Sequence, residues 1–360
     1  MSHCLKDLYN KEYIYTLAST IHSVDANFLV QPFIDTIFTK DFQDKELKAR
    51  MRYISTSLKI FLPERYEKSI NILKDTFSKM NHLYSLENII FQDYVEVYGL
   101  NFFDISMVAL EHFTIGSTSE FAVRAFILQD EDKTLAVMRK WAKSNNEELR
   151  RLASEGCRPR LPWAVALNSF KTNPSKILTI LEILKDDDSK YVQKSVANSL
   201  NDISKDNPDI LKDIVEKWIG KKDSRDWILK HGCRTLLKAG DAEVLKLFGY
   251  DNIDDIKISS FTLSKDVKLG DTLSFEFQLK SIKDIKKLRI EYIIEFVRLN
   301  NKFSKKVFKI SEGSFKKGER LINKKHSFKP ISTRKYYSGK HKIFLVLNGK
   351  IVKEEEFSLC

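Results

Sequence analysis

A short cationic stretch carries the residues whose types could do chemistry. Residues 149–163 read LRRLASEGCRPRLPW, in which a helix is predicted to end at Gly156 as a left-handed C-cap. Glu155 then faces the negative end of the helix dipole, which is unfavourable for a carboxylate by about 0.3–1 kcal/mol. NSLNDISKDNP repeats the feature, because Asp202 lies near the end of its predicted helix. Two helices therefore each place a carboxylate where local electrostatics disfavour it.

If the two helices stack as repeats, Glu155 and Asp202 come together on one rim, beside the loop that carries Arg158, Arg160 and Trp163. Two carboxylates, an aromatic face and a cationic rim predict a site for a positively charged group attached to a polyanion. Each residue also has an ordinary structural explanation. Glu155 could be a solvated acid paired with a nearby arginine, Asp202 could cap a turn, Trp163 could fill a gap between repeats, and the arginines could be rim charges.

The helices that carry these acids belong to a repeated pattern. Three segments share an amphipathic pattern with a basic residue and a small residue in the middle: ELRRLASEG, YVQKSVANSLNDIS and WILKHGCRTLLKAG. Their basic residues are Arg151, Lys194 and Lys230, which stand 43 and 36 positions apart (194 − 151 and 230 − 194). FAVRAFILQD, residues 121–130, is an earlier member with irregular spacing. Periods near 40 built from paired helices are typical of HEAT-like solenoids. We therefore predict an α-solenoid over residues 1–250, whose second helices direct these basic residues into one concave groove.

The residue composition and the hydrophobic periodicity of the sequence change after Gly249. Segments such as IKISSFTL, TLSFEFQLKS, KLRIEYIIEFVRL, KKVFKI and KIFLVLNG are rich in β-branched and aromatic residues with two-residue alternation, and turn signals separate them. About seven short strands in roughly 105 residues fit an immunoglobulin-like β-sandwich. The predicted fold class is therefore α + β with two domains, an α-solenoid of residues 1–250 and a basic sandwich of residues 251–360, joined near residues 250–255.

The positive charge is concentrated in the second of these domains. Residues 1–250 contain 36 lysines and arginines and 35 aspartates and glutamates. Residues 251–360 contain 25 lysines and arginines but only 14 aspartates and glutamates. Residues 281–350 alone carry 20 basic and 5 acidic side chains. Such a field favours a polyanionic partner, first nucleic acid and second a membrane surface. A Lys-rich surface that serves only solubility is the alternative.

Cysteine spacing and hydropathy exclude several other classes. The four cysteines stand far apart, without a CxxC pair or a histidine at zinc-ligand spacing, so we expect a reducing cytoplasm and no metal. Cys157 and Cys233 are predicted to be structural thiols, because no His–Asn or His–Asp pattern accompanies either. Neither a signal peptide nor an apolar run of bilayer length is evident, so we expect no membrane anchoring.

Four motifs together resemble a known family. They are similar to the AlkC branch of the AlkC/AlkD HEAT-like-repeat DNA glycosylases. The motifs are TSEFAVRAF, RRLASEGCRPRLPWA, VQKSVANSLNDISKDNP and WILKHGCRTLLKAGD. The resemblance covers most of residues 100–245, and the sandwich is similar to the immunoglobulin-like domain of one subgroup. It implies repair of alkylated double-stranded DNA without a cofactor, excising 3-methyladenine and secondarily 3-methylcytosine from bent duplex without a conventional base-flipping pocket. It further implies an active site of Glu120, Glu155, Trp163 and Asp202.

The chemistry of such a substrate is consistent with these residue types. N3 methylation makes the base cationic, so the leaving group is already activated, and the enzyme must stabilise an oxocarbenium-like sugar and orient a water. We expect Asp202 nearest the sugar, Glu155 sharing the electrostatic work and positioning water, and Glu120 assisting. Trp163 would hold the cation through its π face, a contact worth about 0.5–2 kcal/mol.

The basic residues then acquire a role in binding phosphates beside the lesion. These are Arg151, Arg158, Arg160, Lys194, Lys230, His231 and Arg234. No lysine is assigned as a Schiff-base nucleophile, so we expect a monofunctional enzyme. We also expect the protein to be a monomer. The main alternative is a non-catalytic HEAT-repeat adaptor that binds nucleic acid or protein. A protein-binding sandwich attached to a degenerate repair enzyme is a third possibility.

Overall fold

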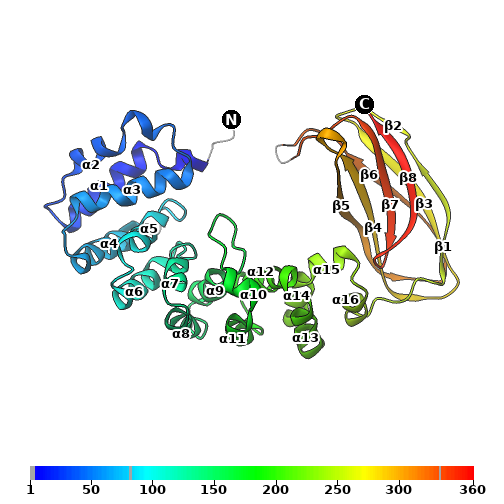
Figure 1. The fold of residues 1–360 in the computed structure, drawn as a ribbon, viewed down its shortest axis with the longest axis horizontal. Coiled ribbons are helices and arrows are strands. Elements are labelled where there is room, and N and C mark those ends of the chain that lie inside the picture. The colour runs from blue at the N-terminus through cyan, green and yellow to red at the C-terminus, as the bar shows by residue number, and fades with distance from the viewer. Residues whose placement is uncertain (1–4, 81–82, 332–333) are drawn as a thin grey trace. The chain divides into compact units, whose positions relative to one another are not determined.

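The computed structural model describes residues 5–80, 83–331 and 334–360. The chain divides into two compact units. The first comprises residues 1–211 and 218–232, and the second comprises residues 212–217 and 233–360. The described residues form a helical part followed by a part made of eight strands, so the predicted α + β fold class is confirmed (Figure 1).

Sixteen α-helices lie in the described part of the chain. They are α1 (Lys11–Val24), α2 (Val30–Ile37), α3 (Leu47–Phe61), α4 (Tyr66–Met80), α5 (Ile89–Tyr98), α6 (Phe103–Thr114), α7 (Val123–Gln129), α8 (Glu131–Trp141), α9 (Glu147–Gly156), α10 (Asn168–Thr172), α11 (Ser175–Leu184), α12 (Lys190–Asp206), α13 (Pro208–Trp218), α14 (Asp223–Gly232), α15 (Arg234–Ala239) and α16 (Ala242–Leu247). Among the same residues, no helix combines the length and apolarity needed to cross a membrane.

The repeated motifs form neighbouring helices. α9 packs against α12, and α12 packs against α14, while α8 and α11 pack against each other and against α9. In Figure 1, α9, α12 and α14 accordingly lie side by side in one row. The apolar stripe of α11 is buried, and α11 packs against α8, α9 and α12. The stripe consists of Ile177, Ile180, Leu181 and Leu184. The 3.6-residue period thus positions successive helices so that their equivalent residues can meet.

Gly156 departs from its predicted conformation. The prediction of a left-handed C-cap is wrong, because Gly156 is the last residue of α9 and lacks a positive φ, and the C-cap is Cys157 with φ −93°. Glycine is needed here for space rather than for backbone conformation. A Cβ at this position would lie 2.6 Å from Val123 Cγ1, closer than van der Waals contact allows. The close approach brings the end of α9 against α7.

The second unit contains two sheets. A three-stranded sheet has the order β1-β3-β6, and a five-stranded sheet has the order β2-β8-β7-β4-β5. The strands are β1 (Ile256–Leu263), β2 (Asp266–Val267), β3 (Thr272–Ser281), β4 (Ile285–Val297), β5 (Phe303–Phe315), β6 (Gly318–Ser327), β7 (Gly339–Leu347) and β8 (Lys350–Leu359). All pairs are antiparallel except β2 with β8. Alternate apolar residues of the two sheets form one shared core, as in an immunoglobulin-like sandwich.

The helices α15 and α16 group with the sandwich rather than with the preceding helices. Gly240, with φ 74°, lies so close to Gly349 of the β7–β8 turn that a Cβ would sit 2.7 Å from its carbonyl oxygen. Lys287 Nζ donates to the Phe248 carbonyl at 2.6 Å, and Tyr250 Oη donates to Glu312 at 2.8 Å. Residues that were expected to form a linker are therefore fixed to the sandwich.

Candidate active site

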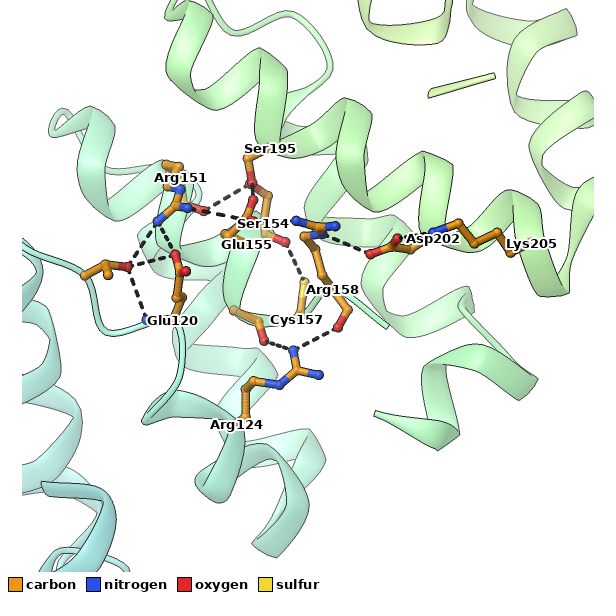
Figure 2. A network of polar contacts seen from close by, with 12 residues as sticks. Glu120, Arg124, Arg151, Ser154, Glu155, Cys157, Arg158, Ser195, Asp202 and Lys205 are labelled. Atoms are coloured by element: carbon orange, nitrogen blue, oxygen red, sulfur yellow. Dashed lines mark hydrogen bonds and ion pairs between the residues drawn. The ribbon is translucent and has the colours of Figure 1, made fainter. Parts of the chain in front are cut away.

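A chain of alternating acidic and basic side chains runs across α9 and α12 (Figure 2). It contains three carboxylates and three cations, so its formal charges balance. In spatial order its members are Glu120, Arg151, Glu155, Arg158, Asp202 and Lys205. All three acids that the family resemblance singled out belong to it. The packing of α9 on α12 is what brings residues more than 40 positions apart into one network.

Glu155 is buried in the last turn of α9, with 5% of its surface exposed. Its Oε1 accepts a hydrogen bond from Arg158 Nη1 at 2.6 Å, and its Oε2 accepts one from Ser195 Oγ of α12 at 2.7 Å. Ser154 Oγ donates to the same Ser195 hydroxyl at 2.6 Å. The alternative of a solvated acid paired with Arg151 or Arg158 is therefore right about the pairing and wrong about the solvation. Its unfavourable place on the helix dipole is offset by a charge-assisted hydrogen bond and a hydroxyl donor.

Asp202 is the most deeply buried acid of the network, with 1% exposed, and lies one turn before the end of α12. Its Oδ2 accepts from Arg158 Nε at 2.9 Å, and its Oδ1 accepts from Lys205 Nζ at 3.1 Å. Both oxygens thus face cationic side chains. The alternative that Asp202 caps the following turn is wrong, because the C-cap is Asn207.

Arg158 lies between Glu155 and Asp202 and is itself 7% exposed. Burial lowers the pKa of this guanidinium, but the two carboxylates together raise it above its usual value. A buried ion pair adds little stability compared with an apolar pair, so its presence points to a role other than stability. Arg158 was predicted to bind a DNA phosphate. In the structure its guanidinium instead faces the two acids.

Glu120 and Arg151 continue the network toward α7. Glu120 lies just before α7, pairs with Arg151 and accepts a hydrogen bond from Thr118 Oγ1 at 3.0 Å. The Arg151 guanidinium also lies over the Tyr191 ring at 5.0 Å. An open pocket of about 350 Å³ adjoins them, lined in part by Thr118, Glu120, Arg151 and Tyr191. Arg151 therefore belongs to the acid network as well as to the predicted basic set.

Trp163 lies in the loop between α9 and α10. Its side chain is 62% exposed, so it fills no gap between repeats, contrary to the structural alternative. Its backbone is left-handed, with φ 64°, which is uncommon for a residue with a Cβ. Its carbonyl accepts a hydrogen bond from Lys48 Nζ of α3 at 2.6 Å. The loop that also carries Arg158 thus presents a large aromatic ring to solvent.

The other predicted DNA-binding residues occupy varied positions. Arg160 is bound to Asp206 by two hydrogen bonds of 2.9 and 2.5 Å. Lys194 is exposed on α12, and Lys230 is half-buried on α14. His231 stacks on Trp227 with ring centroids 5.2 Å apart. Arg234 is half-buried at the start of α15, in the second compact unit, so the predicted set is divided between the two units.

Two residues near the site carried no functional expectation. Arg124 of α7 is fully buried and donates to the carbonyls of Gly156, Arg158 and Val165. Burial lowers its pKa to about 10. A charged residue within the apolar run FAVRAFIL was the signal that could have identified it. Lys48 had no such signal, because its contact lies 115 residues along the chain.

The two internal cysteines are structural, as predicted. Cys157 and Cys233 are both buried, and burial raises the pKa of each thiol to about 12. A thiol with such a pKa supplies almost no thiolate near neutral pH. Among the described residues, no three His, Cys, Asp or Glu side chains are arranged to hold a metal ion.

Comparisons with known proteins agree on one family. The protein-family model described as "DNA alkylation repair enzyme" matches residues 114–236. A second family model, described as "Uncharacterised protein YhaZ, C-terminal Ig-like domain", matches residues 257–360. The chain is 44% identical over 358 residues to the uncharacterized protein YhaZ of Bacillus subtilis strain 168, covering 99% of both chains. It matches the structure of Pseudomonas fluorescens alkylpurine DNA glycosylase AlkC, bound to DNA containing an abasic site analogue, with TM-score 0.95 and 33% identity, covering 99% of this chain and 100% of that one. The chain therefore belongs to the AlkC family of DNA alkylation repair glycosylases with a C-terminal immunoglobulin-like domain.

Proposed function

We propose that this protein is a monomeric, monofunctional glycosylase that releases 3-methyladenine, and secondarily 3-methylcytosine, from double-stranded DNA. The observation that carries the proposal is the pair of buried carboxylates, Glu155 and Asp202, held by one arginine. The match to a glycosylase structure that contains abasic-site DNA supports the same conclusion. DNA is the partner, and its phosphates account for the basic excess of residues 281–350.

The reaction requires negative charge rather than a strong acid. A base methylated at N3 already carries a positive charge, so it leaves without protonation, and the sugar passes through an oxocarbenium-like transition state. Asp202 is assigned to stabilise that charge, and Glu155 to orient the attacking water, with Glu120 contributing to the field. Carboxylates held at fixed positions in a dry site stabilise a developing cation without reorganising.

Arg158 is assigned a positioning role in this mechanism. Its Nε and Nη1 groups point to different acids, so its planar fork sets the separation of Asp202 and Glu155. The guanidinium also keeps the two like charges apart in a buried site. The phosphate-binding role is assigned to the exposed Lys194 and to the remaining basic residues of the predicted set.

The abasic product should remain unbroken. Strand cleavage by a bifunctional glycosylase requires an amine that attacks C1′. Lys205 is the amine of the network, and it donates to Asp202 at 3.1 Å. Because that ion pair occupies the ammonium, Lys205 is not assigned as a nucleophile.

The direct experiment incubates the full-length protein with methylated duplex DNA. Chromatography of the released bases should show 3-methyladenine first, and the DNA strand should break only after alkaline treatment. Borohydride should trap no covalent complex, and light scattering should give the mass of one chain. A protein that binds DNA but releases no base would be an adaptor, and the catalytic assignment would be withdrawn.

Trp163→Leu is expected to slow release of 3-methyladenine by about 2- to 30-fold, whereas Trp163→Phe should retain most activity. The reason is that a cation–π contact contributes about 0.5–2 kcal/mol, and phenylalanine keeps a smaller π face while leucine keeps none. Single-turnover rates at saturating enzyme measure the effect. Because Trp163 is 62% exposed, neither variant should lose its cooperative melting transition.

Tyr15, also 62% exposed, supplies the matched control for Trp163. It lies on α1, so Tyr15→Leu removes an exposed aromatic ring of similar accessibility away from the acids. Its excision rate should equal that of the wild type. Equal rates for Trp163→Leu and Trp163→Phe would show that the π face has no part in the reaction.

A further inference from the structure

One loop carries both the arginine that holds the acids and the exposed tryptophan. Residues 157–167 connect α9 to α10, and they include Arg158 and Trp163. Inside the loop, Leu167 N donates to the Pro159 carbonyl at 3.1 Å, and Ala164 N donates to the Leu161 carbonyl at 3.3 Å. Two such bonds leave most of its backbone orientation to contacts with other elements.

Arg124 of α7 holds the base of this loop at both of its ends. Its Nη1 donates to the carbonyls of Gly156 at 2.9 Å and Arg158 at 2.8 Å, while its Nε donates to the Val165 carbonyl at 2.9 Å. A buried guanidinium that binds backbone carbonyls uses its donors to fix backbone position. The entry and exit of the loop are thereby fixed to the same side chain.

Lys48 of α3 holds the tip. Its ammonium donates to the Trp163 carbonyl at 2.6 Å and lies 5.0 Å from the centre of the Phe121 ring. Trp163 is the residue with the left-handed backbone, a conformation that is unfavourable for a residue with a Cβ and persists only when surrounding contacts impose it. The side chain that reaches its carbonyl comes from a helix more than 100 residues earlier.

We propose that Lys48 and Arg124 are positioning residues that fix the loop of residues 157–167 from two sides, and so hold Trp163 and Arg158 in their working places. The proposal rests on the proposed function for its effect on excision. It also gives the N-terminal helices a part in the active site, since α3 supplies Lys48. Neither residue is among the four that are assigned to the active site.

The structure provides a matched control for each residue. Lys59, also on α3, donates its ammonium to a backbone carbonyl, that of Glu64, at 2.7 Å. Arg50 is buried like Arg124, and its guanidinium binds the carbonyls of Lys6, Gln43 and Lys45 at 2.8 to 3.0 Å. Each control therefore loses the same kind of contact as its partner, but away from the loop.

The experiment compares Lys48→Met with Lys59→Met, and Arg124→Lys with Arg50→Lys, in the full-length protein. Fluorine NMR of 5-fluorotryptophan-labelled protein reports on the four tryptophans, and Trp163→Phe identifies the Trp163 resonance. Lys48→Met and Arg124→Lys should shift or narrow that resonance while the other three stay unchanged. Single-turnover release of 3-methyladenine should fall about 5- to 50-fold for both, with DNA affinity retained, and the controls should match wild type in both readouts.

The two readouts separate failure of the inference from failure of the proposed function. An unchanged Trp163 resonance in Lys48→Met and Arg124→Lys would overturn the proposal that these residues fix the loop, whatever the excision rates are. If the resonance responds as expected but wild-type protein releases no base, the positioning role of Lys48 and Arg124 is retained and the glycosylase proposal fails. Should Arg124→Lys be unstable, Lys48→Met still decides, because Lys48 is exposed and its loss removes no core packing.

Discussion

Asp202→Asn is expected to lower the single-turnover rate of 3-methyladenine release by about 100- to 1000-fold, while affinity for methylated duplex stays nearly constant. An amide keeps the shape of the side chain but removes the charge that is assigned to the oxocarbenium-like sugar, and one preorganised electrostatic contact is worth about 10²–10³ in rate. Binding and chemistry separate because the assay uses enzyme in excess. Glu155→Gln should behave similarly.

Asp206→Asn is the control for this prediction. Asp206 lies one turn beyond Asp202 on α12 and pairs with Arg160, so this variant loses a more exposed Arg–Asp ion pair outside the acid network. Its rate should stay within about twofold of wild type. Breaking a buried pair is destabilising by about 3–5 kcal/mol, so thermal melting must show that Asp202→Asn is folded at the assay temperature. Equal rates for Asp202→Asn and wild type would remove Asp202 from the mechanism.

DNA affinity is expected to fall steeply with salt, by about 10³–10⁵ between 50 and 200 mM, for a protein that contacts six to ten phosphates. A variant with four lysines of the sandwich changed to glutamine should show a flatter slope, by about 0.9 for each phosphate contact that is lost. The four ammonium groups have no carboxylate within 4.0 Å in the described part of the chain. They belong to Lys306, Lys324, Lys325 and Lys329. Damaged and undamaged duplexes should weaken alike, because phosphates carry no lesion information.

The control changes four sandwich lysines that are already paired. Lys283, Lys305, Lys316 and Lys342 contact Asp255, Glu295, Asp284 and Glu354 respectively. Both variants reduce the formal net charge from +12 to +8, so a difference between them reflects contact with phosphate rather than net charge. The paired set should retain the wild-type slope. If the two variants lose affinity equally and keep that slope, the sandwich does not bind the DNA backbone, and the solenoid alone would make the phosphate contacts.

Sequence patterns predicted the helix positions of Glu155 and Asp202 better than their surroundings. The helix-end positions of Glu155 and Asp202 follow from periodicity, and the helices do pack as neighbours. The same reasoning placed Gly156 in a left-handed cap, although its role is to admit Val123. It also treated Arg158 as a rim charge or phosphate contact. Local pattern specifies which face a residue occupies, but not which partner meets it there.

The sequence by itself determined the two kinds of fold, the carboxylates on the repeated helices and the concentration of positive charge near the C-terminus. These depend on residue type and short periods, which local backbone geometry converts directly into helices and strands. Only the tertiary structure decided that Arg158 faces two acids, that Arg124 binds three carbonyls and that Lys48 reaches Trp163. Hydrogen bonds form within about 0.5 Å of an ideal distance, so their partners across 32 to 115 positions depend on how whole helices pack.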